Sequence, residues 1–261
     1  MASPVRYPGG VSTDFPWQPL ANFGLPNPFD YHFWEDDFDD FKANANTYTV
    51  TATGNGAAAN YAIDGGAVRL TTNSSTPATT DIVSVQLPAA SYAFVPSTSS
   101  VSGKTSHFWA RVQLSDVTNA AFVIGLGNTT TAPFSASLTD GLYFTKASGS
   151  TQINLVSNIG GTTVTTAVPV SAYTLANATY IDLCWYYDGR STAAAPNGTV
   201  QIFVGNELIA GGQSNSARGP VASFQPTSLT TALMNPTLAV QSGTASSKTM
   251  TVDFLFAARQ R

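Results

Sequence analysis

Carboxylate side chains, which could hydrolyse a glycosidic bond, are few in this sequence. Such hydrolysis needs two carboxyl groups about 5–5.5 Å apart in retaining enzymes or about 6.5–9.5 Å apart in inverting enzymes. The chain has two glutamates, Glu35 and Glu207, far apart in sequence, and no expected strand carries acids at alternating positions. Asp182 stands alone on its strand face. The sequence therefore predicts that the chain is not an enzyme.

Five acids interleaved with aromatics in residues 35–41 form the next candidate site. Calcium takes about six to eight oxygen ligands, so carboxylates on a turn could bind it. The EF-hand spacing, with its central glycine and terminal glutamate, is absent. We expect Phe38 and Phe41 to enter the core while the aspartates mostly meet water. Calcium binding and partner contact remain alternatives, and no cofactor is predicted.

The remaining reactive side chains are isolated from one another. His32 and His107 have no cysteine or acid at zinc-ligand spacing, and no Ser-His-Asp or Cys-His arrangement is evident. The single cysteine, Cys184, lies in an apolar run and is expected to be a small buried filler. Gly125-Leu126-Gly127 is followed by neither helix nor lysine, so it predicts a bulge or close sheet packing and not a phosphate loop.

Aromatic side chains offer a possible sugar-stacking surface. Trp109 shares its predicted strand face with Arg111 and Gln113, so we identify Trp109 and Arg111 as the candidate glycan-facing residues. The alternative is that these aromatics serve cross-strand and core packing. Trp185 shares a face with Ile181 and Leu183 and is expected in the core.

Composition narrows the classes of partner. Only 10% of the 261 residues are charged, against about 25% in an average soluble protein, and the formal net charge is −4. The basic residues are scattered singly, so no stripe exists to neutralise phosphates and nucleic-acid binding is not expected. No run of 18 apolar residues and no secretory leader are evident, so we expect no membrane partner and synthesis in a cytoplasm.

From about residue 47 onward the pattern is that of short β-strands separated by turn signals such as Asp140-Gly141 and Asp188-Gly189. The expected strands are Thr47–Thr53, Ala67–Thr72, Asp81–Leu87, Ser106–Ser115, Ala120–Gly127, Gly141–Lys146, Gln152–Ser157, Thr162–Val168, Thr179–Tyr187, Gly198–Val204 and Thr249–Ala257. Half-buried alternation in these strands predicts an all-β fold, a two-sheet antiparallel β-sandwich of the jelly-roll, concanavalin A-like kind.

Three details of these strands are testable against a structure. Phe108, Ala110, Val112 and Leu114 should face one way, and His107, Trp109, Arg111 and Gln113 the other. Met250, Val252, Phe254 and Phe256 are expected to share one face. Gly205-Asn206 is expected to join Ile202-Phe203-Val204 to Glu207-Leu208-Ile209 in a two-residue hairpin.

Residues 1–30 form a separate zone, an extended N-terminal arm ahead of the sandwich domain of residues 31–261. Six prolines there forbid helix and any central strand. A disordered tail would lack the large apolar side chains of this zone. We expect these side chains to be buried against the arm's own domain, a neighbouring subunit or a larger assembly. The candidate partner-binding residues are Tyr7, Phe15, Trp17, Phe23, Leu25 and Phe29.

An ordered series of segments resembles a family of phage virion proteins with a concanavalin A-like, laminin G-like sandwich. The series covers roughly residues 33–261. Its segments are Phe33–Phe41, Gly65–Thr72, Phe108–Asp116, Phe122–Leu126, Asp140–Phe144, Ile181–Gly189, Thr199–Asn206 and Val252–Phe256.

This resemblance implies a capsid decoration, or cement, protein that binds the outer surface of a bacteriophage head. The implied partner is the major capsid protein, the implied assembly is a homo-oligomer (trimer or dimer), and the implied location is the virion. The alternative function is a carbohydrate-binding, lectin-like module on a head or tail fibre. The family resemblance supplies no ligand residues for this chain.

Overall fold

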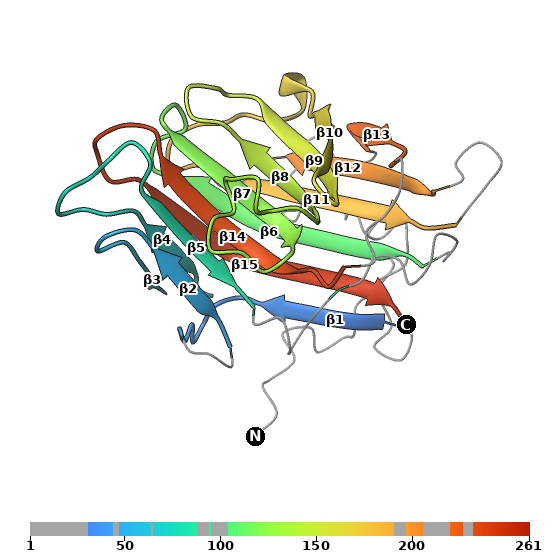
Figure 1. Cartoon of the computed structure of the whole chain (residues 1–261), viewed down its shortest axis with the longest axis horizontal. Coiled ribbons are helices and arrows are strands. Elements are labelled where there is room, and N and C mark those ends of the chain that lie inside the picture. The colour runs from blue at the N-terminus through green and yellow to red at the C-terminus, as the bar shows by residue number, and fades with distance from the viewer. Residues whose placement is uncertain are drawn as a thin grey trace.

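The computed structural model describes residues 31–43, 47–63, 65–87, 94, 104–190, 197–205, 220–226 and 232–261. These residues form two stacked antiparallel sheets (Figure 1). One sheet has eight strands in the order β13-β12-β11-β6-β15-β4-β3, with β1 also paired to β15. The other has seven strands in the order β10-β9-β8-β7-β14-β5-β2. The predicted all-β, two-sheet antiparallel sandwich is confirmed.

The strands of the eight-stranded sheet are β1 (Tyr31–Asp36), β3 (Ala57–Asn60), β4 (Val68–Thr71), β6 (Ser106–Leu114), β11 (Ile181–Asp188), β12 (Thr199–Gly205), β13 (Ala222–Phe224) and β15 (Thr249–Gln260). Those of the seven-stranded sheet are β2 (Thr49–Ala52), β5 (Ile82–Gln86), β7 (Ala120–Gly127), β8 (Gly141–Lys146), β9 (Ile153–Ile159), β10 (Thr162–Ala167) and β14 (Asn235–Ser242). A short 3-10 turn, η2 (Val170–Ala172), follows β10. No helix in the described part of the chain is long and apolar enough to cross a membrane.

The main core lies between the two sheets and is built by alternate residues of each strand. Phe108, Ala110, Val112 and Leu114 of β6 all enter it, as predicted. Trp185 of β11 is fully buried there, and its ring stacks on that of Phe108 with centroids 5.8 Å apart. Burying large apolar side chains from both sheets is the main favourable contribution to folding.

A bulge in β15 overturns the predicted face of two phenylalanines. The register of β15 with β6 shifts between Val252 and Phe254. One extra residue, Asp253, therefore reverses the alternation that follows. Met250 and Val252 point into the main core, whereas Phe254 and Phe256 belong to the outer surface of the eight-stranded sheet.

Strand β14 was not predicted, although it is central in its sheet, between β7 and β5. Its second residue is Pro236, and a proline argues against a central strand because it cannot donate a ladder hydrogen bond. The proline is tolerated because it lies at the start of the strand. Its carbonyl still accepts from the Leu87 amide at 3.3 Å.

Strands β7 and β8 approach closely at a glycine. A Cβ added to Gly125 of β7 would lie 2.4 Å from the Tyr143 Cα of β8, so this glycine serves close sheet packing, as predicted.

In the acidic turn, Asp36 accepts hydrogen bonds from the Phe38 amide at 2.6 Å and the Tyr48 hydroxyl at 2.5 Å. Phe38 and Phe41 are buried, as expected.

Two predicted features fall wholly or partly outside the described residues. The arm residues Tyr7, Phe15, Trp17, Phe23, Leu25 and Phe29 all precede the described part of the chain. The hairpin partner Glu207-Leu208-Ile209 is also outside it. Within the described residues, β12 pairs with β13, which places Ile202 opposite Ala222.

Candidate functional site

The outer face of the eight-stranded sheet carries a row of polar and aromatic side chains that we call the tyrosine–arginine strip: Tyr61, Arg69, Arg111, Tyr180 and Asp253. Arg69 of β4 lies opposite Thr251 of β15, and Thr251 lies opposite Gln113 of β6. Tyr180 directly precedes β11, on the same face as Asp182, which pairs with Arg111. The strip therefore crosses four neighbouring strands.

The first half of the strip is a stacked pair. The guanidinium carbon of Arg69 lies 3.2 Å from the centroid of the Tyr61 ring. The Arg69 Nε donates to the Thr251 hydroxyl at 3.2 Å. A guanidinium held over an aromatic face is a favourable cation–π contact, and here the hydrogen bond also fixes its orientation. Tyr61 and Arg69 are both half-buried.

The second half repeats the same combination on the neighbouring strands. The Arg111 guanidinium carbon lies 5.1 Å from the centroid of the Tyr180 ring, and its Nε is 3.6 Å from the Asp253 carboxylate. That separation exceeds a hydrogen bond, and the buried Nε has no hydrogen-bond partner among the described residues. Burial, followed by the nearby Asp253 charge, raises the pKa of Tyr180, so its hydroxyl stays neutral.

This arrangement offers half-exposed rings beside several hydrogen-bonding groups on rigid strands. A ligand hydroxyl could accept from the partly exposed guanidinium groups of Arg69 and Arg111, and ring faces favour the apolar faces of a sugar. Arg111, a predicted glycan-facing residue, is thus brought into a half-buried site. The Asp253 carboxylate balances its charge.

Trp109, the other predicted glycan-facing residue, is buried, with a relative exposure of 6%. It belongs to a cluster that we call the outer aromatic patch: Trp109, Cys184, Tyr186, Phe203 and Phe256. The Trp109 ring makes a T-shaped contact with Phe254 at 5.9 Å. The predicted strand face of Trp109 was correct, but its predicted exposure was wrong, because alternation specifies the face of a sheet and not what covers that face.

His107 contacts the outer aromatic patch through Tyr186 and is fully buried. Its ring centroid is 4.7 Å from that of Tyr186 and 5.7 Å from that of Tyr31. Neither ring nitrogen has a hydrogen-bond partner among the described residues. Burial lowers the pKa of His107 to about 3, so the imidazole is neutral at ordinary pH.

The remaining reactive groups are separated from one another. Cys184 is fully buried, as expected for a small filler, and burial raises the pKa of its thiol. Burial, then Arg261 and Arg259, lower the pKa of His32. Across the described residues, no group of three histidine, cysteine or acidic side chains could hold a metal ion.

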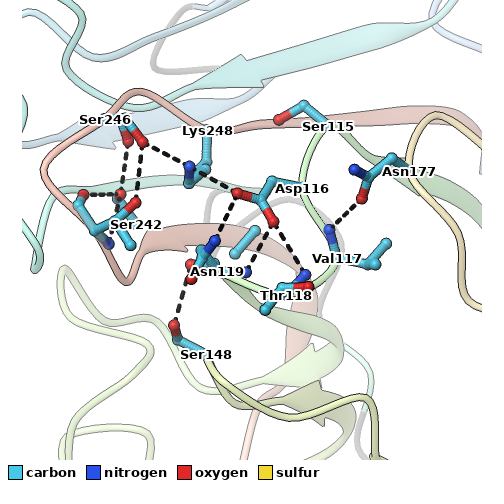
Figure 2. Close-up of polar contacts among 12 residues, drawn as sticks. Ser115, Asp116, Val117, Thr118, Asn119, Ser148, Asn177, Ser242, Ser246 and Lys248 are labelled. Carbon is cyan, nitrogen blue, oxygen red and sulfur yellow. Dashed lines mark hydrogen bonds and ion pairs between the residues drawn. The ribbon is translucent and has the colours of Figure 1, made fainter.

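A polar node closes one end of the sandwich (Figure 2). Asp116 accepts from the Thr118 amide at 3.1 Å and from the Asn119 amide and side chain at 3.0 and 2.9 Å. Its other contact is an ion pair with Lys248 at 2.9 Å. Hydrogen bonds from the Asn119 side chain and from Lys248 hold the pKa of Asp116 well below its usual range. These contacts join the turn after β6 to the start of β15, so the node is structural.

The outer face of the seven-stranded sheet is covered by the β7–β8 connection. Phe134 and Leu138 pack there against Val123, Tyr143 and Val156. Gln86 of β5 anchors the connection: its Nε2 donates to the carbonyl of residue 128 at 3.2 Å, and its Oε1 accepts from the amide of residue 130 at 3.0 Å.

Comparison with solved structures identifies the architecture. The chain aligns with the Emp47p carbohydrate recognition domain at 10% identity over 90% of this chain and 98% of that one, with a TM-score of 0.52. It aligns with arcelin-5, a lectin-like defence protein from Phaseolus vulgaris, at 11% identity over 89% and 99%, with a TM-score of 0.54. The fold is that of the concanavalin A-like lectins and glucanases. No family model and no curated protein sequence matches the chain.

A concanavalin A-like sandwich also occurs in a similar enzyme. The chain aligns with a Bacteroides ovatus mixed-linkage glucan GH16 protein, solved with a product, at 9% identity over 85% of this chain and 98% of that one, with a TM-score of 0.52. In the present sandwich, however, none of the strands of the seven-stranded sheet contains an aspartate or glutamate. Those strands cannot mount the paired carboxyls that glycoside hydrolysis requires.

Sequence reasoning missed most of the strip. Tyr61 and Arg69 are close in sequence, but Arg111, Tyr180 and Asp253 come from distant parts of the chain and join them only through the strand order of this concanavalin A-like sheet. A usable signal was the alternation of β6, which placed Arg111 on the outer face. Nothing local indicated that Arg69 would stack on Tyr61.

Proposed function

We propose that the chain is a carbohydrate-binding module, and that the tyrosine–arginine strip binds a neutral oligosaccharide. The observation that carries this proposal is the repeated arginine–tyrosine contact on one sheet face, where both guanidinium groups and both rings are partly exposed. A sugar hydroxyl would accept hydrogen bonds from these partly exposed guanidinium groups, while the rings would pack on the apolar faces of the sugar.

Charge supports a neutral ligand and not an anionic one. Arg111 is balanced by Asp253 within the strip, and the chain carries a formal net charge of −4. A polyanionic glycan would be repelled by the molecule as a whole, although salt would screen this repulsion. Neutral hexose oligosaccharides are therefore the proposed ligand class.

A glycan array followed by titration calorimetry tests the proposal. Arg111→Ala should weaken binding of the selected neutral oligosaccharide about tenfold, which corresponds to about 1.4 kcal/mol. Arg190→Ala is the matched control, because Arg190 is an exposed arginine paired to Asp188 outside the strip. It should leave affinity unchanged. Equal affinities for Arg111→Ala and the intact chain, or no ligand on the array, would refute the strip as a glycan site.

The second proposed function is capsid decoration, with the major capsid protein as partner and a dimer or trimer as the assembly. Its support is the resemblance of residues 33–261 to phage virion sandwich proteins and the low charged fraction of 10%. This function predicts copurification with intact particles at a copy number near that of the coat protein. Absence from purified heads would contradict it.

We also propose that the module is not catalytic. This rests on the strands of the seven-stranded sheet, which lack acidic residues, and on Asp182, which is fully buried in β11. Incubation with the array ligand should release no reducing sugar. Turnover that disappears in Asp182→Asn would overturn this proposal.

A further inference from the structure

Strand β10 is an edge strand with one open side. It lies at the end of the seven-stranded sheet, and among the described residues it pairs with β9 alone. Four of its six residues are exposed and none is fully buried. The open side of β10 is therefore accessible to another strand.

The backbone of β10 directs unpaired groups at this open side. Val168, which follows the strand, donates to the Ile153 carbonyl of β9 at 3.0 Å. Successive residues of an antiparallel strand point their N–H and C=O groups alternately towards and away from a neighbouring strand. The N–H and C=O groups of Thr163, Thr165 and Ala167 therefore point away from β9. Such a row of unpaired groups is a template for pairing with another strand.

Strand β10 lacks the features that usually keep edge strands apart, which are charged side chains, proline and bulges. Residues 147–181, which include β10, contain no aspartate, glutamate, lysine, arginine or histidine. All six residues pair with β9 without a shift of register, and Pro169 follows the strand instead of interrupting it. The nearby Asp140 accepts from the Gly160 amide at 3.1 Å, in the turn that precedes β10. Its charge therefore lies beyond the end of the strand.

The sequence of β10 is self-complementary about its centre. Residues 162–166 read Thr-Thr-Val-Thr-Thr, which is the same in both directions. When two copies pair antiparallel about Val164, Thr163 of one copy lies opposite Thr165 of the other. Both residues direct their backbone groups outward, so each such pair can exchange two hydrogen bonds. Threonine pairs across strands are favourable, and the half-buried Val164 meets its own equivalent.

We propose that two copies of this chain associate through β10, antiparallel and centred on Val164, and join their seven-stranded sheets into one continuous sheet. A second copy fits because a two-fold interface uses the same surface on both chains, and this surface is uncharged and matches itself. The proposal does not depend on glycan binding or on capsid decoration, because the tyrosine–arginine strip lies on the other sheet.

Sedimentation velocity of the full chain tests the interface. The intact chain should form a dimer with a dissociation constant of about 100 μM or tighter. Thr163→Lys combined with Thr165→Lys should weaken the dimer about tenfold or more, because each lysine then faces a lysine of the second copy. An intact chain that stays monomeric at about 1 mM, or a dimer that survives these lysines, would overturn the proposal.

The matched control is Thr49→Lys combined with Thr51→Lys. These threonines alternate in the same way on β2, the edge strand at the opposite end of the same sheet, so the control adds the same charge away from β10. It should dimerise like the intact chain. Loss of the dimer in this control would contradict an interface at β10.

A charge-swap variant tests the register. Thr163→Lys combined with Thr165→Glu places each lysine opposite a glutamate of the second copy, so the dimer should return to within about threefold of the intact affinity. In the intact chain, dimerisation should slow hydrogen exchange at the amides of Thr163 and Thr165 but not at that of Val164, which already faces β9. A charge-swap variant that stays monomeric, or unchanged exchange at both threonine amides, would overturn the proposed pairing.

Discussion

Acid should destabilise the protein through His107, and His107→Phe should remove most of this effect. His107 is fully buried against Tyr186 and Tyr31, and burial lowers its pKa to about 3. In the unfolded chain the imidazole titrates near its ordinary pKa of about 6.5. Between these two values the unfolded state binds a proton that the native state does not, so stability falls as the pH is lowered from about 6.5 towards 3.

The size of the effect follows from that difference. At pH 7 both states are largely neutral at His107, so its contribution is small. At pH 5 the unfolded chain has gained most of a proton while the native histidine remains neutral, which lowers the free energy of unfolding by about 2 kcal/mol. Phenylalanine keeps the ring contacts with Tyr186 but has no proton to bind.

Urea denaturation at pH 7 and pH 5 measures this difference. The intact chain should lose about 2 kcal/mol more between the two pH values than His107→Phe does. His32 and the carboxylates titrate in both proteins and cancel in the comparison. Equal losses in the two proteins would refute the assignment of a neutral, buried His107.

Four further substitutions test the packing and the polar node. Asp116→Asn should lower the free energy of unfolding at pH 7 by about 1 kcal/mol, because it removes the ion pair with Lys248 and weakens the turn hydrogen bonds. The lowered pKa of Asp116 means that this difference should shrink as the pH falls below about 4, and a constant difference in denaturation curves would contradict that. Gly125→Ala should lower the free energy of unfolding by about 3 kcal/mol, because the new Cβ would meet the Tyr143 backbone. Gly149→Ala is the comparison: a Cβ there would meet nothing within 4 Å, but the φ of +76° disfavours alanine, so the loss should be about 1 kcal/mol. Thermal unfolding measures both losses. Trp185→Ala should cost about 3–5 kcal/mol by chemical denaturation, since the side chain is fully buried against Phe108, and a loss below about 1 kcal/mol would place Trp185 outside the core.

The sequence predicted most strands of the sandwich because their alternation and turn residues are local signals. Strands β7 and β8 have the predicted bounds, Ala120–Gly127 and Gly141–Lys146. Strand β14 escaped prediction because Pro236 is an unfavourable local signal that the start of a strand tolerates. The predicted face of Phe254 and Phe256 was wrong because a bulge at Asp253 adds one residue to the strand. No sequence pattern within the strand indicates this bulge.

The candidate site was less predictable because it depends on strand order. Alternation placed Arg111 and Trp109 on the outer face, but their different burial is decided by what lies above each position. Tyr61 and Arg69 are close in sequence, whereas Tyr180 and Asp253 join them through the pairing of β11, β6, β15 and β4. Such non-local pairing is not readable from one sequence.

The most direct test of glycan binding at the tyrosine–arginine strip is to follow the arginine Nε–H signals by NMR during a titration with the array-selected neutral oligosaccharide. The signals of Arg69 and Arg111 should shift with ligand concentration and saturate together, while that of Arg190 stays in place. Saturable binding that leaves the Arg69 and Arg111 signals unmoved would contradict the proposed site.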